Sequence, residues 1–210
     1  ILDKFTELEA ELEAELEARR SQYEHYRREV LTFGQGVEWV ALSDVADYTN
    51  GKAHERLADP DGDVPMVTAR FISRNGEPNR FVRLQDVQMP ASSGDTALVL
   101  SDLPNGRALA RTFYVDRDNG YAINQRVARL RVKDVDRVDP RFLYRVLDRN
   151  PGLLKHDNGV DQTHLSKSQV TGLRFPVPLI QEQHQIVGLL DKFDALVNDL
   201  SIGLPAEISA

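Results

Sequence analysis

Apolar residues recur every three or four positions along the first 33 residues, which predicts one long amphipathic helix. They are Phe5, Leu8, Leu12, Leu16, Tyr23, Tyr26, Val30 and Phe33, with Glu-rich segments between them. Gly and Pro are absent before Gly34. We therefore expect a rod of about 45 Å, at roughly 1.5 Å per residue. A rod of this length must bury its apolar stripe against another helix.

The predicted partner is a second helix whose start repeats that of the first. Residues 2–8 and Leu12 return as residues 190–196 and Leu200, shifted by 188 positions, and six positions of the eleven-residue window are identical. This internal repeat predicts a modular unit of helix, insert and helix. We expect the helix to begin after Pro178 and to stop at residues 203–205, and the two helices to pair as an antiparallel coiled coil. The predicted pairing residues are Phe5, Leu8, Leu12, Leu16, Tyr23, Tyr26, Leu190, Phe193, Leu196 and Leu200.

The residues between the helices predict a separate α+β domain. Strand-like runs at 64–72, 96–100, 108–115 and 127–132 alternate with Gly, Pro, Asn and Asp clusters. We expect short, mainly antiparallel strands. Asp139 followed by Pro140 marks the start of one helix, and Ser166 marks another. The predicted segments are a helix at 1–33, a globular domain at 37–178 and an incomplete second helix at 179–210.

Charge is unevenly distributed along the chain. The formal net charge is −7, yet residues 34–180 carry nineteen acids and twenty bases, so the acidity belongs to the two helices. Arg outnumbers Lys in the middle, and the Arg guanidinium suits guanine edges and phosphates. Cysteine is absent, which excludes disulfides and thiolate chemistry. We expect a soluble cytoplasmic protein with no membrane segment, and a first residue of Ile favours a piece of a longer chain.

Motifs for catalysis or metal binding fail on spacing. The acidic turn at 59–63 has its glycine in the wrong place for a calcium loop. Asp161, His164 and Ser166 supply the residue types of a hydrolase triad, but they lie too close together in sequence to form the relay. No cofactor, metal site or catalytic residue is predicted for the chain itself.

Both ends of the chain resemble the DNA specificity subunit of type I restriction-modification systems. The resemblance rests on 19–33, the Val37-Glu38-Trp39 segment, and the run from Pro176 through Glu182-Gln183 to Leu190-Asp191-Lys192-Phe193. Weaker similarities are Asn124-Gln125 and 162–166. The rest of the middle domain, which differs between specificities, shows no match.

The resemblance implies a non-catalytic subunit whose target recognition domains each read half of a split DNA site and are held apart by conserved helical spacers. It also implies methyltransferase subunits, which carry S-adenosylmethionine, and restriction subunits as partners. This chain has one such domain. Either a second domain precedes it in a longer protein, or a half-size form dimerises head-to-tail.

Candidate DNA-contacting residues are those whose side chains can reach base edges or phosphates. Three stretches supply them: Arg70, Arg74, Asn75, Asn79, Arg80 and Arg83; Asn105, Arg107 and Arg111; and Lys155, His156, Gln162, His164 and Lys167. The first stretch is favoured. Asn124 and Gln125 are equally consistent with buried structural amides.

Two other functions remain open from the sequence. The chain could be a protein–protein adaptor that dimerises through its helix, or an enzyme whose catalytic groups the motifs do not reveal. Sequence-specific binding of double-stranded DNA distinguishes the recognition subunit from the adaptor.

Overall fold

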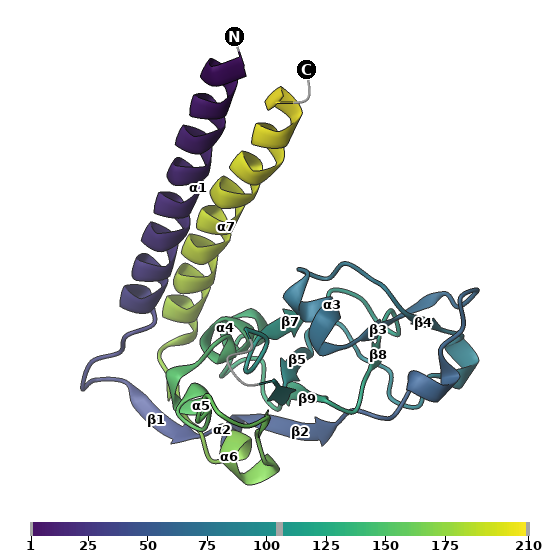
Figure 1. Cartoon of the computed structure of the whole chain (residues 1–210). Helices are drawn as coiled ribbons and strands as arrows, with labels where there is room; N and C mark the ends of the chain where they lie inside the picture. Colours follow the sequence, from purple (N-terminus) through teal and green to yellow (C-terminus); the bar gives the residue numbers. More distant parts are fainter. Residues whose placement is uncertain (1, 104–106, 209–210) are drawn as a thin grey trace. The chain divides into compact units, whose positions relative to one another are not determined.

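A computed structural model describes residues 2–103 and 107–208 (Figure 1). The chain divides into two compact units, one formed by residues 1–36 and 181–210 and the other by residues 37–180. The first contains the two long helices, and the second is the α+β domain.

The helical unit consists of α1 (Leu2–Val30) and α7 (Ile180–Ile208), which lie side by side and antiparallel (Figure 1). Tyr26 of α1 stacks on Phe193 of α7, with ring centroids 5.4 Å apart. Leu190 is fully buried, whereas Leu196 keeps 58% of its surface exposed. The side chains of Phe5, Leu8, Leu16 and Leu200 lie outside the described residues. Coiled-coil packing along the whole stripe therefore stays a prediction.

Two helix ends differ from the sequence prediction. The first helix ends at Val30, and Leu31 to Phe33 leave it. The second was expected to stop at residues 203–205, but α7 continues to Ile208. A proline removes one backbone donor and can kink a helix without ending it, so the stop signal was wrong here.

The α+β unit is built from short elements. Its strands are β1 (Glu38–Ala41), β2 (Ala46–Asn50), β3 (Val64–Val67), β4 (Phe81–Val82), β5 (Thr96–Val99), β6 (Ser101–Asp102), β7 (Thr112–Tyr114), β8 (Ala122–Ile123), β9 (Val127–Val132), β10 (Thr163–His164) and β11 (Arg174–Val177). Its helices are α2 (Leu42–Val45), α3 (Ala69–Ser73), α4 (Pro140–Leu147), α5 (Pro151–Leu154) and α6 (Lys167–Thr171), with 3₁₀ turns η1 (Glu55–Leu57) and η2 (Leu84–Asp86).

The strands form one four-stranded sheet and three smaller ones. The largest has the order β2-β9-β5-β7 and is antiparallel throughout. A three-stranded sheet has the order β4-β3-β8, and in it β3 pairs with β8 in parallel. The β1–β11 pair joins the two ends of the unit, with Glu38 opposite Val177. The α+β class is confirmed, and the β3–β8 pair is the exception to the antiparallel expectation.

Capping residues explain the helices and one wrong strand boundary. Asp139 accepts hydrogen bonds from the backbone N–H groups of Arg141 and Phe142, which confirms the predicted start of α4. Ser166 caps α6 in the same way. The strand-like run at 64–72 ends at Val67, because Thr68 caps α3 through a 3.1 Å hydrogen bond from Phe71 N. Apolar content alone did not distinguish this helix from a continuing strand.

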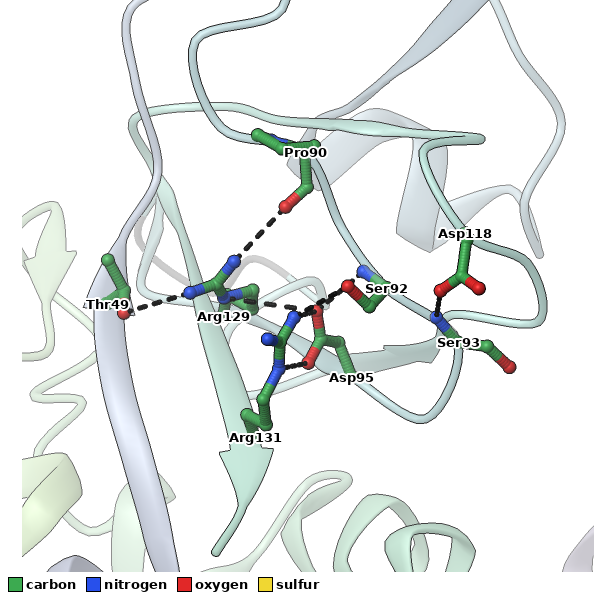
Figure 2. Close-up of polar contacts among 8 residues, drawn as sticks. All are labelled: Thr49, Pro90, Ser92, Ser93, Asp95, Asp118, Arg129 and Arg131. Carbon is green, nitrogen blue, oxygen red and sulfur yellow. Dashed lines mark hydrogen bonds and ion pairs between the residues drawn. The ribbon is translucent and has the colours of Figure 1, made fainter.

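A buried carboxylate, that of Asp95, binds arginine side chains of the large sheet (Figure 2). Asp95 is 1% exposed and accepts hydrogen bonds from Arg131 Nε at 2.7 Å and Arg131 Nη2 at 2.8 Å. The backbone N–H of Ser92 donates to the same carboxylate at 2.8 Å, and Arg129 Nε lies 3.9 Å away. The hydrogen bonds that Arg131 donates to Asp95 are the main reason that the pKa of Arg131 is raised. The network ties β9 to the loop that precedes β5.

We predict that Asp95→Asn lowers the free energy of unfolding by roughly 2–3 kcal/mol, because it leaves two guanidinium groups without their anionic partner. Urea denaturation measures the change. Asp118→Asn is the matched control, since exposed Asp118 accepts one hydrogen bond from Ser93 N at 2.9 Å. Equal destabilisation by both variants would contradict a special role for the buried carboxylate.

Candidate nucleic-acid interface

The α+β unit contains a cleft of about 260 Å³ that is rich in arginine. We call it the arginine cleft and define it by its lining residues, Glu55, Thr68, Ala69, Arg70, Asn79, Arg80, Asn124 and Arg126. Three of the eight are arginines, against a single carboxylate. Positive charge in a concave site focuses an attractive field on phosphates.

The parallel pairing of β3 and β8 brings the cleft residues together from distant parts of the chain. Val67 lies opposite Ile123, and Asn124 N donates to Val67 O at 3.1 Å. Both strands therefore end side by side. The residues that follow β3 lead into α3 with Arg70, and those that follow β8 form the turn that carries Arg126.

A glycine allows a third segment to approach this point closely. Gly51 N donates to Val127 O at 2.9 Å, and Lys52 N donates to Ile123 O at 3.0 Å. A Cβ at position 51 would lie 2.0 Å from Asn124 O and 2.8 Å from Ile123 O. Only glycine fits, and the close approach brings η1 with Glu55 to the cleft.

Buried and exposed amides hold the Glu55 carboxylate in place. Asn124, 3% exposed, donates from Nδ2 to Glu55 Oε1 at 2.6 Å, and its Oδ1 accepts from His54 N at 3.3 Å. Gln125 Nε2 donates to the same Oε1 at 3.3 Å. Burial works to raise the pKa of Glu55, but these hydrogen bonds and the charge of Arg80 outweigh it, and the net shift is downward. The carboxylate is therefore ionised at neutral pH.

The arginines of the first predicted stretch differ in whether they form an ion pair. Arg74 Nη1 lies 3.8 Å from Glu77 Oε2, and Arg83 Nε lies 2.5 Å from Asp59 Oδ2. In the described part of the chain, no ion pair involves Arg70 or Arg126, and both side chains are exposed. Arg70, Asn79 and Arg80 line the cleft, whereas Arg74, Asn75 and Arg83 do not. Asn75 instead adopts a φ of 55° in the turn after α3.

Hydrogen bonds connect parts of the other two predicted stretches to this region. Arg111 Nη1 donates to Ser73 O of α3 at 3.5 Å. Gln162 Nε2 donates to Ser101 Oγ at 3.1 Å, next to Leu100, whose N–H donates to Arg126 O. Lys167, also of the third stretch, makes a different contact, because its Nζ lies 5.8 Å from the centroid of the Tyr48 ring.

The remaining candidates have weaker links to the cleft. Arg107, Lys155 and His164 are exposed, and His156 is half-buried. His164 pairs with Ser101 through β10 and β6, while no described contact joins Lys155 or His156 to the cleft. Asn105 lies outside the described residues.

Two charged cleft residues, Glu55 and Arg126, are absent from the sequence-based candidates. Arg126 was identifiable in principle, because it directly follows Asn124-Gln125. Glu55 gave no local signal, since the contact that places it spans 69 residues. The described residues contain no cluster of three or more His, Asp or Glu side chains suited to a metal ion. None of the described helices combines the length and apolarity that a membrane crossing requires.

Comparison with known proteins identifies the family. Residues 35–210 match the family described as the type I restriction modification DNA specificity domain. The chain belongs to this family. The match to the specificity domain includes the arginine cleft and α7.

Individual relatives agree with this assignment. The chain is 29% identical to the specificity subunit of a type I restriction enzyme from Escherichia coli, over 99% of its own length and 54% of that subunit. The HsdS subunit of Thermoanaerobacter tengcongensis has a similar fold, with a TM-score of 0.60, 21% identity, and coverage of 97% of this chain and 53% of that one.

A second solved structure, described as the structural basis of complex assembly and conformational transition of the type I R-M system, gives a TM-score of 0.64 at 16% identity. It covers 99% of this chain and 56% of that one. This specificity-domain chain therefore spans about half the length of these relatives.

We predict that Gly51→Ala distorts the arginine cleft and destabilises the domain by at least about 1–3 kcal/mol, because the added methyl group overlaps the Asn124 backbone. Thermal unfolding measures the effect. Gly36→Ala is the control, since a Cβ there would meet nothing within 4 Å. An unchanged midpoint for Gly51→Ala would show that the two segments do not approach as described.

Proposed function

We propose that this chain reads one half of a bipartite DNA target for a type I restriction-modification complex, and that the arginine cleft is its DNA-contacting surface. The observation that carries the proposal is the convergence of Arg70, Arg80 and Arg126, two of them without an ion-pair partner in the described chain. Guanidinium groups bind guanine edges bidentately and also bind phosphates. Membership of the specificity-domain family supports this assignment.

In this proposal the chain is non-catalytic and binds no cofactor of its own. Methyltransferase subunits would carry S-adenosylmethionine and methylate the target, and restriction subunits would cleave DNA. The similarity to a structure concerned with type I complex assembly supports these partners. We place the complex in the cytoplasm, with the DNA that it modifies.

The acidic helices suit a protein partner better than DNA. Residues 9–17 carry five glutamates, which would repel phosphates. We propose that α1 and α7 form the spacer and docking surface for the other subunits. An adaptor without DNA binding would share these helices, but the family assignment does not favour it.

We predict that Arg70→Ala and Arg126→Ala each weaken binding of the cognate duplex by about tenfold or more, because a base contact is worth about 1–3 kcal/mol. Fluorescence anisotropy against cognate and scrambled duplexes measures both affinity and specificity. Removing an arginine that contacts a base lowers the preference for the cognate duplex. Removing one that contacts a phosphate weakens binding of both duplexes and lowers the salt dependence of binding.

Arg174→Ala is the matched control, because it removes the same charge from an exposed position on β11. Arg74→Ala tests the sequence-based alternative, since Arg74 is exposed and close to Glu77 rather than in the cleft. Full binding by both cleft variants, with loss in Arg74→Ala, would move the interface away from the cleft.

Solution mass tests the proposed assembly. We expect the chain to form a complex with a methyltransferase subunit of its system, measured by light scattering without DNA. A dimer of the chain alone supports the head-to-tail half-subunit, and a monomer that binds one methyltransferase subunit supports half of a longer chain. Failure to bind any methyltransferase subunit would contradict the scaffold role.

A further inference from the structure

The arginine cleft contains one carboxylate at a place where phosphates would be repelled. Glu55 lines the cleft beside three arginines, and the cleft otherwise favours anions. An ionised carboxylate there costs affinity for DNA unless it accepts a hydrogen bond from the ligand. Its presence therefore requires either a purely internal role or a specific donor.

The two carboxylate oxygens of Glu55 have different surroundings. Oε1 accepts hydrogen bonds from Asn124 Nδ2 at 2.6 Å and from Gln125 Nε2 at 3.3 Å. The backbone N–H of Glu55 itself also hydrogen-bonds to the carboxylate. In the part of the chain that the structure describes, both side-chain donors bind Oε1 and none binds Oε2. The side-chain contacts thus fix the carboxylate through one oxygen and leave the other able to accept from a ligand.

The amides that hold Glu55 are themselves committed. Asn124 is buried and uses Nδ2 for Glu55 and Oδ1 for His54 N, so it has little capacity left for a base. Gln125 is exposed, but it directs Nε2 towards the same carboxylate. A bidentate amide contact to adenine requires both the oxygen and the nitrogen to face the base. Buried Asn124 has both groups engaged, and Gln125 turns its Nε2 towards Glu55.

Major-groove chemistry limits what an acceptor can recognise. Adenine presents the N6 amino group and cytosine the N4 amino group as donors, whereas guanine O6 and thymine O4 are acceptors. A fixed carboxylate beside guanine or thymine would lose a hydrogen bond and meet a second acceptor. We infer that Glu55 is a specificity-determining residue that accepts from an adenine or cytosine amino group through Oε2 and rejects guanine and thymine at that position.

This inference rests on the proposed function and adds a base preference to it. The arginines would supply affinity and contacts to guanine or phosphate, while Glu55 would exclude two of the four bases at one position. Asn124 and Gln125 then act as positioning residues, because they orient the carboxylate without contacting the base.

Glu55→Gln gives a test in which the direction of the preference reverses. The glutamine carbonyl can still accept from Asn124 and Gln125, and its NH₂ group then replaces Oε2 with a donor. We expect the preferred base at one position to change from adenine or cytosine to guanine or thymine, by on the order of tenfold in relative affinity.

The experiment uses the full 210-residue chain assembled with its methyltransferase subunits. Duplexes with a randomised segment are selected for binding and sequenced, for the wild type, for Glu55→Gln and for Glu38→Gln. Glu38→Gln is the matched control, because it makes the same change in an exposed β1 residue that pairs with Arg137 at 2.9 Å. The control should select the wild-type sequence.

The outcomes separate the two proposals. Selection of no sequence by the wild type would overturn DNA reading by the chain and the role of Glu55 with it. A sequence selected by the wild type and shared unchanged by Glu55→Gln would overturn the role of Glu55 alone.

A second variant covers the case in which Glu55→Gln does not fold, as measured by thermal unfolding. Glu55→Ala then replaces it, and acceptance of all four bases at one position is expected. Retention of the wild-type preference by Glu55→Ala would equally overturn the inference.

Discussion

The parallel pairing of β3 with β8 is the contact on which the arginine cleft depends. It is the only parallel pair among the named strands of the described chain, and it makes two strands end at the same edge. The segments that follow them place Arg70 and Arg126 in the lining of one cleft. Gly51 then lets a third segment lie against the β8 turn at a distance that any side chain would prevent. The site is therefore a consequence of backbone geometry, and its side chains converge because their strands do.

Charge in the α+β unit is divided between structural pairs and available groups. Asp95 binds Arg131 and lies close to Arg129 within the sheet (Figure 2), and Asp59 binds Arg83. These arginines stabilise the fold. Arg70 and Arg126 lie in the cleft and have no such partner among the described residues, which leaves their guanidinium groups available for a ligand. An excess of Arg over Lys in this domain thus reflects two separate uses, and composition cannot distinguish them.

The pairing of β1 with β11 explains how such a domain can be inserted between two helices. Glu38 lies opposite Val177, so the chain enters and leaves the α+β unit at neighbouring points. An insert with adjacent ends can vary inside without changing the helices that flank it. The repeat at residues 2–12 and 190–200 fits this arrangement, because one copy lies in the helix on each side of the insert. The copy in α1 is at the start of the helix, whereas the copy in α7 starts ten residues after Ile180.

The sequence by itself determined the features that depend on local periodicity and capping. It predicted the two long helices, the starts of α4 and α6, the strand at β9, the α+β class and the resemblance that the family match later confirmed. It missed the end of α7 and the short α3, where local signals compete. Only the tertiary structure decided which arginines meet, because Arg70, Arg80 and Arg126 converge through a strand pairing that no local pattern encodes. Glu55 joins them through a hydrogen bond across 69 residues, and contacts of that range are set by the fold as a whole.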